Sequence, residues 1–225
     1  MADEIERNQL RGLRVVAIDG PAGSGKSTIA RALAARLGLE YLDTGAMYRA
    51  VAYAVIRAQV DVDDVDRVAE IAGRLELEVG ARGVFVDGED ATSAIRNQEV
   101  TRAVTEVAAL PEVRQEMKRR QRAWALERGG GVVEGRDIGS VVFPAAQLKV
   151  YLTASPEERA RRRALELAEL DFDRVAQDMA RRDERDSSRA DSPLVVPDDS
   201  YLCDTTDVSV EDVVEDLAAR FEAAV

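Results

Sequence analysis

Residues 20–28 read G-P-A-G-S-G-K-S-T and match in full the pattern of a phosphate-binding loop. Glycines allow the main chain to turn several N–H groups into one concavity, which suits phosphate oxygens. Lys26 is placed to reach the β- and γ-phosphates of a nucleotide, and the Ser27 hydroxyl to reach a Mg²⁺ ion. We therefore predict a nucleotide site that uses the whole loop: Gly20, Pro21, Ala22, Gly23, Ser24, Gly25, Lys26, Ser27 and Thr28.

The flanking segments bear on whether this match is only a chance glycine-rich turn. Residues 13–18 (L-R-V-V-A-I) form an apolar run that suits a buried parallel strand. After the loop, Ile29, Leu33 and Leu37 recur every four residues, which predicts a helix with one apolar face, and Gly38 follows as its C-terminal cap. The order strand, loop, helix is the context that a phosphate loop requires, so it favours a nucleotide site in an α/β protein.

The composition limits the class of ligand. A length of 225 residues suits one α/β domain with small insertions. The net charge of −12 argues against a general binder of nucleic acid polymers or of membrane surfaces. The arginines nevertheless gather in clusters, which favours small polyanionic ligands. The clusters are Arg119, Arg120 and Arg122; Arg159, Arg161, Arg162 and Arg163; and Arg181, Arg182, Arg185 and Arg189.

Two scarce residue types exclude other chemistry. The single cysteine, Cys203, excludes an internal disulfide, and the absence of histidine excludes a Cys/His zinc site and histidine acid–base catalysis. No apolar run is long enough to span a membrane. The polar start of the chain argues against a signal peptide, so we expect a cytoplasmic protein whose residues 1–13 form a flexible tail.

The rest of the chain predicts strands and helices around an insertion. Residues 75–79 alternate strictly between apolar and polar, residues 81–83 suit a turn, and residues 84–86 (V-F-V) follow with a less clean pattern. Together they predict a β-hairpin with one solvent-exposed face, unlike the continuously apolar strands elsewhere. Thr44 is expected to cap a helix. Further helices are predicted over 99–110 and 111–128, after Ser155 and after Ser209, and further strands over 132–133, 148–153 and 201–204.

A phosphate loop permits a small-molecule kinase, a GTPase switch or a motor-type ATPase. No convincing D-x-x-G or N-K-x-D motif supports a GTPase. Motor ATPases usually have a longer apolar strand that ends in acidic residues, and only residues 132–134 approximate it. The arginine clusters favour phosphoryl transfer between two phosphorylated molecules, because guanidinium groups are planar, permanently charged and bidentate. Such an acceptor phosphate needs no strong base. For the cluster at 159–163, phosphate contact and a solvated helix face both remain open.

The chain resembles the bacterial-type cytidylate kinases, from about Arg14 to the final helix. Apart from the phosphate loop, which many families share, the resemblance depends on several motifs. They are L-D-T-G-A-M-Y-R (42–49), I-R-N-Q-E-V (95–100), V-R-Q-E-M-K-R-R-Q-R (113–122), E-G-R-D-I-G-S-V-V-F-P (134–144) and R-R-D-E-R-D-S-S-R (181–189).

The resemblance implies a P-loop α/β fold of three layers around a parallel sheet, with an acceptor-binding insertion at about 43–110 and an arginine-rich lid at about 155–190. It implies a monomer that transfers the γ-phosphoryl group of ATP to CMP or dCMP with Mg²⁺. Thr44, Arg49 and Arg136 would hold the acceptor phosphate, Tyr48 would lie beside the base, and Arg182 and Asp186 would contact the ribose. Thr105, Arg114, Asp137 and Arg189 would read cytosine, and Lys26, Arg49, Arg136 and Arg185 would act in catalysis.

The chemistry of the base supports this assignment. Cytosine offers two acceptors and an exocyclic amine donor, so it needs cationic donors and a carboxylate, here Asp137. Uracil presents an acceptor where cytosine presents the amine, so Asp137 would disfavour it. Two alternatives remain open: a P-loop kinase for another acceptor, such as UMP or shikimate, and a nucleotide-binding switch or assembly module without transferase activity.

Overall fold

The computed structural model describes residues 10, 12–167, 171–189 and 191–225. The expected tail, residues 1–13, therefore lies mostly outside the described residues. The chain forms two compact units: Met1–Tyr41 together with Ala125–Val225, and Leu42–Trp124. We refer to these as unit 1 and unit 2.

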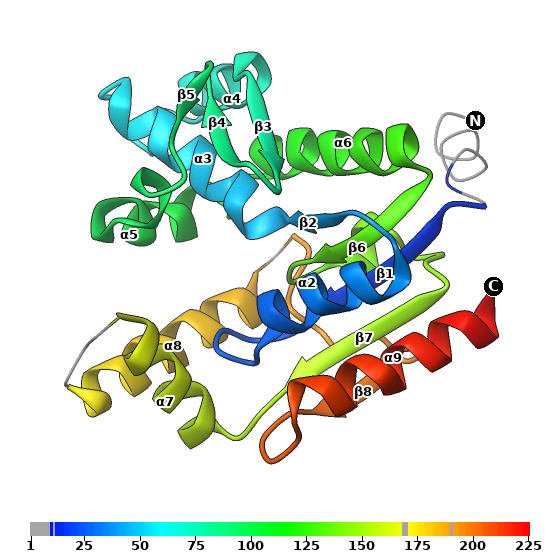
Figure 1. Cartoon of the computed structure of the whole chain (residues 1–225). Helices are drawn as coiled ribbons and strands as arrows, with labels where there is room; N and C mark the ends of the chain where they lie inside the picture. The colour runs from blue at the N-terminus through cyan, green and yellow to red at the C-terminus, as the bar shows by residue number, and fades with distance from the viewer. Residues whose placement is uncertain (1–9, 11, 168–170, 190) are drawn as a thin grey trace. The chain divides into compact units, whose positions relative to one another are not determined.

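The larger sheet has five strands in the order β2-β6-β1-β7-β8 (Figure 1). Strand β1 (Arg14–Asp19) runs parallel to β6 (Gly130–Glu134) on one side and to β7 (Leu148–Thr153) on the other, and β7 runs parallel to β8 (Tyr201–Asp204). Strand β2 (Tyr41–Asp43) crosses the boundary between the units. The predicted parallel α/β architecture is confirmed, and the strands predicted at 148–153 and 201–204 have the observed bounds.

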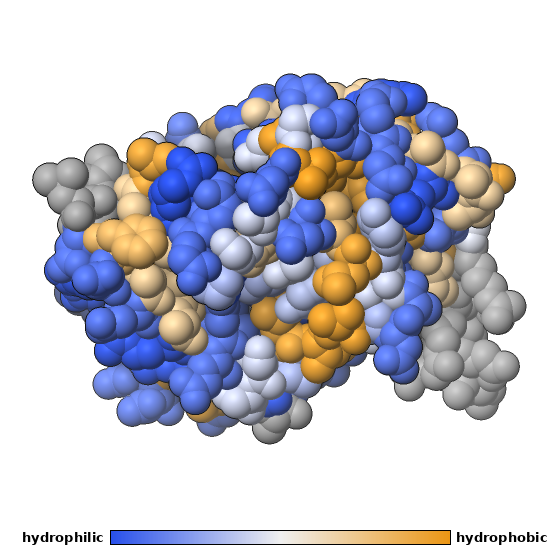
Figure 2. All heavy atoms as spheres, turned by 90° about the horizontal axis from the view of Figure 1, so that it is seen from below, coloured by the Kyte–Doolittle hydropathy of each residue, from blue (hydrophilic) through white to orange (hydrophobic). Residues whose placement is uncertain are grey.

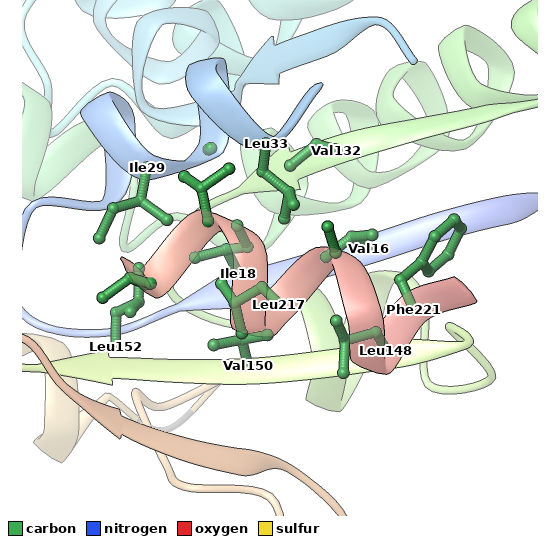
Figure 3. Close-up of a cluster of buried hydrophobic side chains, with 14 of the residues drawn as sticks. Val16, Ile18, Ile29, Leu33, Val132, Leu148, Val150, Leu152, Leu217 and Phe221 are labelled. Carbon is green, nitrogen blue, oxygen red and sulfur yellow. The ribbon is translucent and has the colours of Figure 1, made fainter. Parts of the chain in front are cut away.

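Helices α2 (Lys26–Leu37) and α9 (Val210–Ala224) bury one face of this sheet. Alternate residues of the strands face them, and Figure 3 shows these side chains meeting Leu33 of α2 and Leu217 of α9. The intervening residues, such as Val15 and Ala17, are buried as well. Burial on both faces explains why the strands read as continuous apolar runs. The cluster includes Val16, Ile18, Val132, Leu148, Val150, Leu152, Cys203 and Phe221.

Several helix ends in unit 1 follow the predicted capping chemistry. Gly38 ends α2 in the left-handed conformation with φ 64°, and the Ser209 hydroxyl accepts the N–H of Asp212 at the start of α9. Helix α7 (Pro156–Leu167) begins with the Ser155 hydroxyl accepting the N–H of Glu158. Helix α8 (Phe172–Ser188) packs on α7 through Ala160, Val175 and Met179, and a single π-helical turn, η2 (Ile138–Val142), follows β6.

Unit 2 contains the predicted hairpin, with a short third strand. Strands β3 (Leu77–Gly80), β4 (Gly83–Val86) and β5 (Glu89–Asp90) form an antiparallel sheet. Burial alternates along β4, as expected for a sheet with one solvent-exposed face. The remaining elements are α3 (Thr44–Arg57), α4 (Val65–Arg74), η1 (Ala94–Arg96) and α5 (Gln98–Val107), while α6 (Pro111–Arg128) runs from unit 2 into unit 1.

The prediction that Thr44 caps α3 is wrong. The carboxylate of Asp43 accepts the N–H of Ala46 at 2.9 Å, and Thr44 is the first helical residue. Aspartate accepts this bond at least as well as threonine, and Asp43 lies at the last position of β2, where the main chain is still extended.

The surface seen in Figure 2 is mainly hydrophilic, with a patch of hydrophobic atoms near the centre of that face. Across the described residues, the most exposed large hydrophobic side chains are those of Leu165, Leu202 and Val225. Within the same residues, no helix has the length and apolar character needed to cross a membrane.

Candidate functional site

The phosphate loop leaves β1 at Gly20 and enters α2 at Lys26. Gly23 and Gly25 have φ of 73° and 85°, values that favour glycine, and these turns bring the loop around the start of α2. The Lys26 side chain is buried, and its Nζ donates to the carbonyl oxygen of Pro21 at 2.7 Å. The ammonium group therefore lies inside the loop, where the N–H groups of the first helical turn also gather.

Burial and, to a smaller extent, the positive charges of Arg136 and Arg182 lower the pKa of Lys26 to about 7, while Glu134 and Asp19 oppose the shift. The loop without a ligand therefore holds a lysine that loses its proton near neutral pH. A polyanion in the loop would favour the charged form.

A second loop follows β6, the neighbour of β1, and it carries Arg136 and Asp137. Both carboxylate oxygens of the buried Asp19 accept main-chain N–H groups from this loop, at 2.8 Å from Ile138 and 2.7 Å from Gly139. Burial raises the pKa of Asp19 to about 6, although the two N–H bonds lower it. Asp19 was absent from the predicted site; an acid that ends an apolar strand just before a phosphate loop was the available signal.

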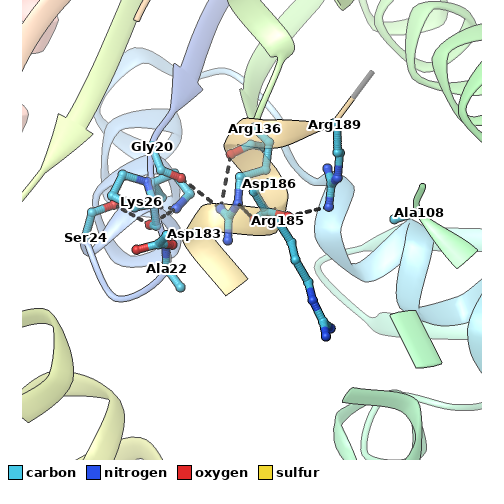
Figure 4. Close-up of polar contacts among 12 residues, drawn as sticks. Gly20, Ala22, Ser24, Lys26, Ala108, Arg136, Asp183, Arg185, Asp186 and Arg189 are labelled. Carbon is cyan, nitrogen blue, oxygen red and sulfur yellow. Dashed lines mark hydrogen bonds and ion pairs between the residues drawn. The ribbon is translucent and has the colours of Figure 1, made fainter. Parts of the chain in front are cut away.

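Arg136 lies between the phosphate loop and helix α8 (Figure 4). Its Nε donates to Asp186 Oδ2 at 2.8 Å, and its Nη1 donates to the carbonyl oxygen of Gly20 at 2.9 Å. Arg189 pairs with the other oxygen of Asp186. Burial would raise the pKa of Asp186, but Arg136 and Arg189 outweigh that effect and hold the pKa below its ordinary value.

The two other predicted residues of α8 differ from each other. Arg182 is partly buried, and its charge lowers the pKa of both Lys26 and Asp186. Arg185 is exposed, and in Figure 4 its side chain points away from the contacts of Arg136 and Asp186. Unit 1 thus brings Arg136 to the phosphate loop, and ion pairs join Asp186 and Arg189 to it. Arg182 lies near enough for its charge to lower the pKa of Lys26, while Arg185 is exposed.

The remaining predicted residues gather within unit 2. Thr44, Tyr48 and Arg49 follow one another along the first turns of α3, and Thr44 is buried. The guanidinium carbon of Arg114 lies 5.7 Å from the centre of the Tyr48 ring, and Arg114 donates to the carbonyl oxygen of Ala108. Thr105 is partly buried on α5.

A hydroxyl that was not predicted also contacts this group. Arg49 donates to the Oγ1 of Thr101 at 3.0 Å, and Thr101 lies one helical turn before Thr105. The bond orients the guanidinium group of Arg49. Local sequence gives no signal for it, because the two residues lie on different helices.

The loop has the oxygen chemistry that a nucleotide-bound Mg²⁺ requires. Ser27 is exposed in the first turn of α2, so its hydroxyl is accessible. Mg²⁺ in such sites takes few protein ligands and keeps waters and phosphate oxygens. The part of the chain that the structure describes has no group of three acidic, histidine or cysteine side chains that could hold a metal.

A family model described as cytidylate kinase matches residues 16–223. The chain belongs to the cytidylate kinase family. It is 49% identical over 213 residues to a cytidylate kinase of Desulfitobacterium hafniense (strain Y51), covering 92% of this chain and 91% of that protein. It is also 49% identical over 208 residues to a cytidylate kinase of Mycobacterium leprae (strain Br4923), covering 90% and 93%.

Among solved structures, the fold is similar to the crystal structure of an uncharacterized protein from Eubacterium ventriosum ATCC 27560, with a TM-score of 0.50. The two chains are 12% identical over 93% of this chain and 98% of that one, so this likeness concerns the fold alone.

Proposed function

We propose that this member of the cytidylate kinase family transfers the γ-phosphoryl group of ATP to CMP or dCMP, giving ADP and CDP or dCDP. The observation that supports it most directly is the position of Arg136. This residue lies in the loop after β6, the strand next to β1, and donates to the phosphate loop itself, at the Gly20 carbonyl. A guanidinium group there suits an anion that reacts with the terminal phosphate of a nucleotide in the loop.

The transfer is a displacement at phosphorus. An oxygen of the acceptor phosphate forms a bond to the γ-phosphorus, and the bond from that phosphorus to the β,γ-bridging oxygen breaks, leaving ADP. The transition state is loose and carries its charge on the equatorial oxygens. We assign Lys26, Arg49, Arg136 and Arg185 to stabilise that charge. The contacts of Arg136 to Asp186 and Gly20 use its Nε and Nη1, and a guanidinium group has five N–H donors, so Arg136 can bind phosphate while it keeps both contacts.

Magnesium would be held by the Ser27 hydroxyl together with phosphate oxygens of ATP. When bound, the ion would neutralise negative charge that develops on the phosphates during transfer.

We assign acceptor recognition to the residues that the resemblance to the family implies. Thr44, Arg49 and Arg136 bind the acceptor phosphate, and Tyr48 lies beside the base. Asp186, which Arg136 and Arg189 keep ionised, accepts hydrogen bonds from the ribose hydroxyls, with Arg182 beside it. Cytosine is read by Thr105, Arg114, Asp137 and Arg189.

The same assignment gives roles to larger segments. Residues 43–110 would bind the acceptor, and residues 155–190, which contain α7 and α8, would form a lid that excludes water from the reacting phosphates. We propose that the enzyme works as a monomer in the cytoplasm.

An assay of ADP release across CMP, dCMP, UMP, AMP and shikimate tests the proposal. We expect turnover with CMP or dCMP at least tenfold above the other acceptors, because a lost bidentate base contact corresponds to about 1–3 kcal/mol. A preference for any other acceptor would refute the cytidine assignment. Binding of ATP without acceptor-dependent turnover would instead support a switch or assembly module.

A further inference from the structure

Ala22, in the phosphate loop, has both of its main-chain polar groups bound by side chains of opposite charge. Its N–H donates to Asp183 Oδ1 at 3.3 Å, and its carbonyl oxygen accepts from Arg159 Nη1 at 3.2 Å. Arg159 and Asp183 also form an ion pair with each other. The three groups close a ring in which α7 supplies the cation and α8 the anion.

Close van der Waals contacts also join the phosphate loop to α7 and α8 at Ala22 and Gly23. The Ala22 side chain contacts the cluster of Ala160, Val175 and Met179 that joins α7 to α8. A Cβ added at Gly23 would lie 2.7 Å from the carbonyl oxygen of Arg159 and 2.9 Å from the Met179 methyl group. The loop therefore lies in direct contact with both helices.

Two neighbouring carbonyl groups of the loop are bound in a similar way. The carbonyl of Gly20 accepts from Arg136, which Asp186 of α8 holds. The carbonyl oxygen of Ser24 lies 3.1 Å from the hydroxyl of Thr205, and that hydroxyl accepts from Arg162. Arg162 in turn pairs with Glu158 of α7. The carbonyls of Gly20 and Ala22 thus accept directly from arginines that carboxylates of α8 hold, and the carbonyl of Ser24 is connected through the Thr205 hydroxyl to an arginine that α7 holds.

Carbonyl groups matter here because a loop that presents N–H groups to an anion must direct its carbonyls elsewhere. Unbound, those carbonyls would let the peptide planes rotate, and each rotation would turn an N–H group out of the concavity. Fixing the planes before the ligand arrives lowers the cost of ordering the loop upon binding.

We propose that Arg159 and Asp183 are positioning residues for the donor nucleotide, and that their ring with Ala22 makes the affinity of the phosphate loop depend on the placement of α7 and α8. The proposal rests on the proposed function only in taking ATP as the ligand of the loop. It also gives one member of the 159–163 arginine cluster a role that is neither direct phosphate contact nor a solvated face.

The chain offers matched controls for both residues. Asp178 pairs with Arg181 on the same helix as Asp183, and Arg161 pairs with Glu158 on the same helix as Arg159. Side chains of the control pair of α8 are 60% and 65% exposed, whereas those of Arg159 and Asp183 are 14% and 19% exposed. Asp178→Ala and Arg161→Met remove the same charges without touching the loop.

The experiment compares the wild type, Asp183→Ala, Arg159→Met, the double variant and the two controls. For each protein, calorimetry without acceptor gives the Kd of MgATP, and steady-state kinetics give the KM of ATP and the KM of CMP. We expect each single variant to weaken ATP binding by about tenfold, a typical effect of removing one charge-assisted hydrogen bond. We also expect the KM of CMP to stay within about twofold of the wild-type value. The double variant should bind MgATP almost as tightly as either single variant, because both changes break the same ring of contacts.

Either of two results would overturn the proposal. One is an unchanged Kd for MgATP together with a lowered melting temperature, which would show that the pair only holds α7 to α8. The other is an equal loss of MgATP affinity in the controls, which would show that the change in net charge alone causes the effect. A wild type that binds MgATP but ignores CMP contradicts the proposed function and leaves the calorimetric comparison intact.

Discussion

The two loops that leave neighbouring strands of the parallel sheet are anchored mainly through opposite halves of the peptide group. The phosphate loop after β1 is bound mainly through its carbonyls, by Arg136, Arg159 and the Thr205 hydroxyl, and Asp183 also binds the N–H of Ala22. The loop after β6 is bound through its N–H groups, by the carboxylate of Asp19.

The difference matches what each loop offers to a ligand. The first loop presents main-chain N–H groups to its ligand, so most of its anchoring contacts are to carbonyls, and the N–H of Ala22, bound by Asp183, is the exception. The second uses the side chains of Arg136 and Asp137, so its amides can serve as the anchor. Asp19 ends β1 and precedes the first loop, so a single residue connects the two arrangements.

Removing the cation inside the first loop should have the largest effect. We expect Lys26→Met, which keeps the aliphatic stem, to lower kcat on the order of 10²- to 10³-fold with every acceptor. The reason is that Lys26 binds the phosphates of ATP, which is the donor for every acceptor. Steady-state kinetics with CMP and dCMP measure this, and an effect confined to one acceptor would contradict it.

Weakening the anchor of the second loop comes next. Asp19→Asn replaces an acceptor with an amide donor opposite the N–H of Ile138 or Gly139. Loss of a hydrogen bond to a charged group corresponds to about 1.5–3 kcal/mol, so we expect kcat/KM for CMP to fall about 10- to 100-fold. The exposed Asp207, changed to Asn, is the control. Equal melting curves and equal kcat/KM for wild type and Asp19→Asn would show that the loop needs no such anchor.

Removing the base-reading side chain of the second loop should affect one ligand only. We expect Asp137→Ala to lower kcat/KM for CMP about tenfold and to narrow the preference for CMP over UMP, while the KM of ATP stays constant. Paired assays with CMP and UMP measure the ratio. Similar losses with both acceptors would remove the base-reading role from Asp137.

The smallest predicted effect is the uptake of a proton by Lys26 when ATP binds. The pKa of Lys26 is about 7 in the loop without ligand, so Lys26 is mostly neutral at pH 8 and mostly charged at pH 6. Bound phosphates favour the charged form, so ATP binding should take up close to one proton at pH 8 and almost none at pH 6. Calorimetry in buffers of different ionisation enthalpy measures the uptake. Lys26→Arg, which stays charged, should abolish it, and equal uptake at both pH values would contradict the assignment.

Local sequence predicted the parts of this site that depend on one segment. The phosphate loop, its strand and its helix were predicted from nine residues and their neighbours, because glycine, lysine and apolar spacing act over short distances. Arg136 and Asp186 were named through the resemblance to the family, and the structure brings both side chains into one contact.

The anchors could not be predicted in the same way. Asp19 binds N–H groups about 120 residues away, and Asp183 binds an N–H 161 residues away. No periodicity or spacing connects such positions. The error at Thr44 is of another kind, since Asp43 and Thr44 are both good caps and only the end of β2 decides between them.

The one cysteine of the chain has a practical consequence. Cys203 is buried among core side chains, and burial, then Asp216 and Asp204, raise the pKa of its thiol. Thiol-directed reagents require an accessible thiolate, so they should leave it unmodified in the folded protein. A cysteine introduced at the exposed Glu184 would then be the single labelling position, and a fluorophore there would report directly on movement of α8 when nucleotides are added.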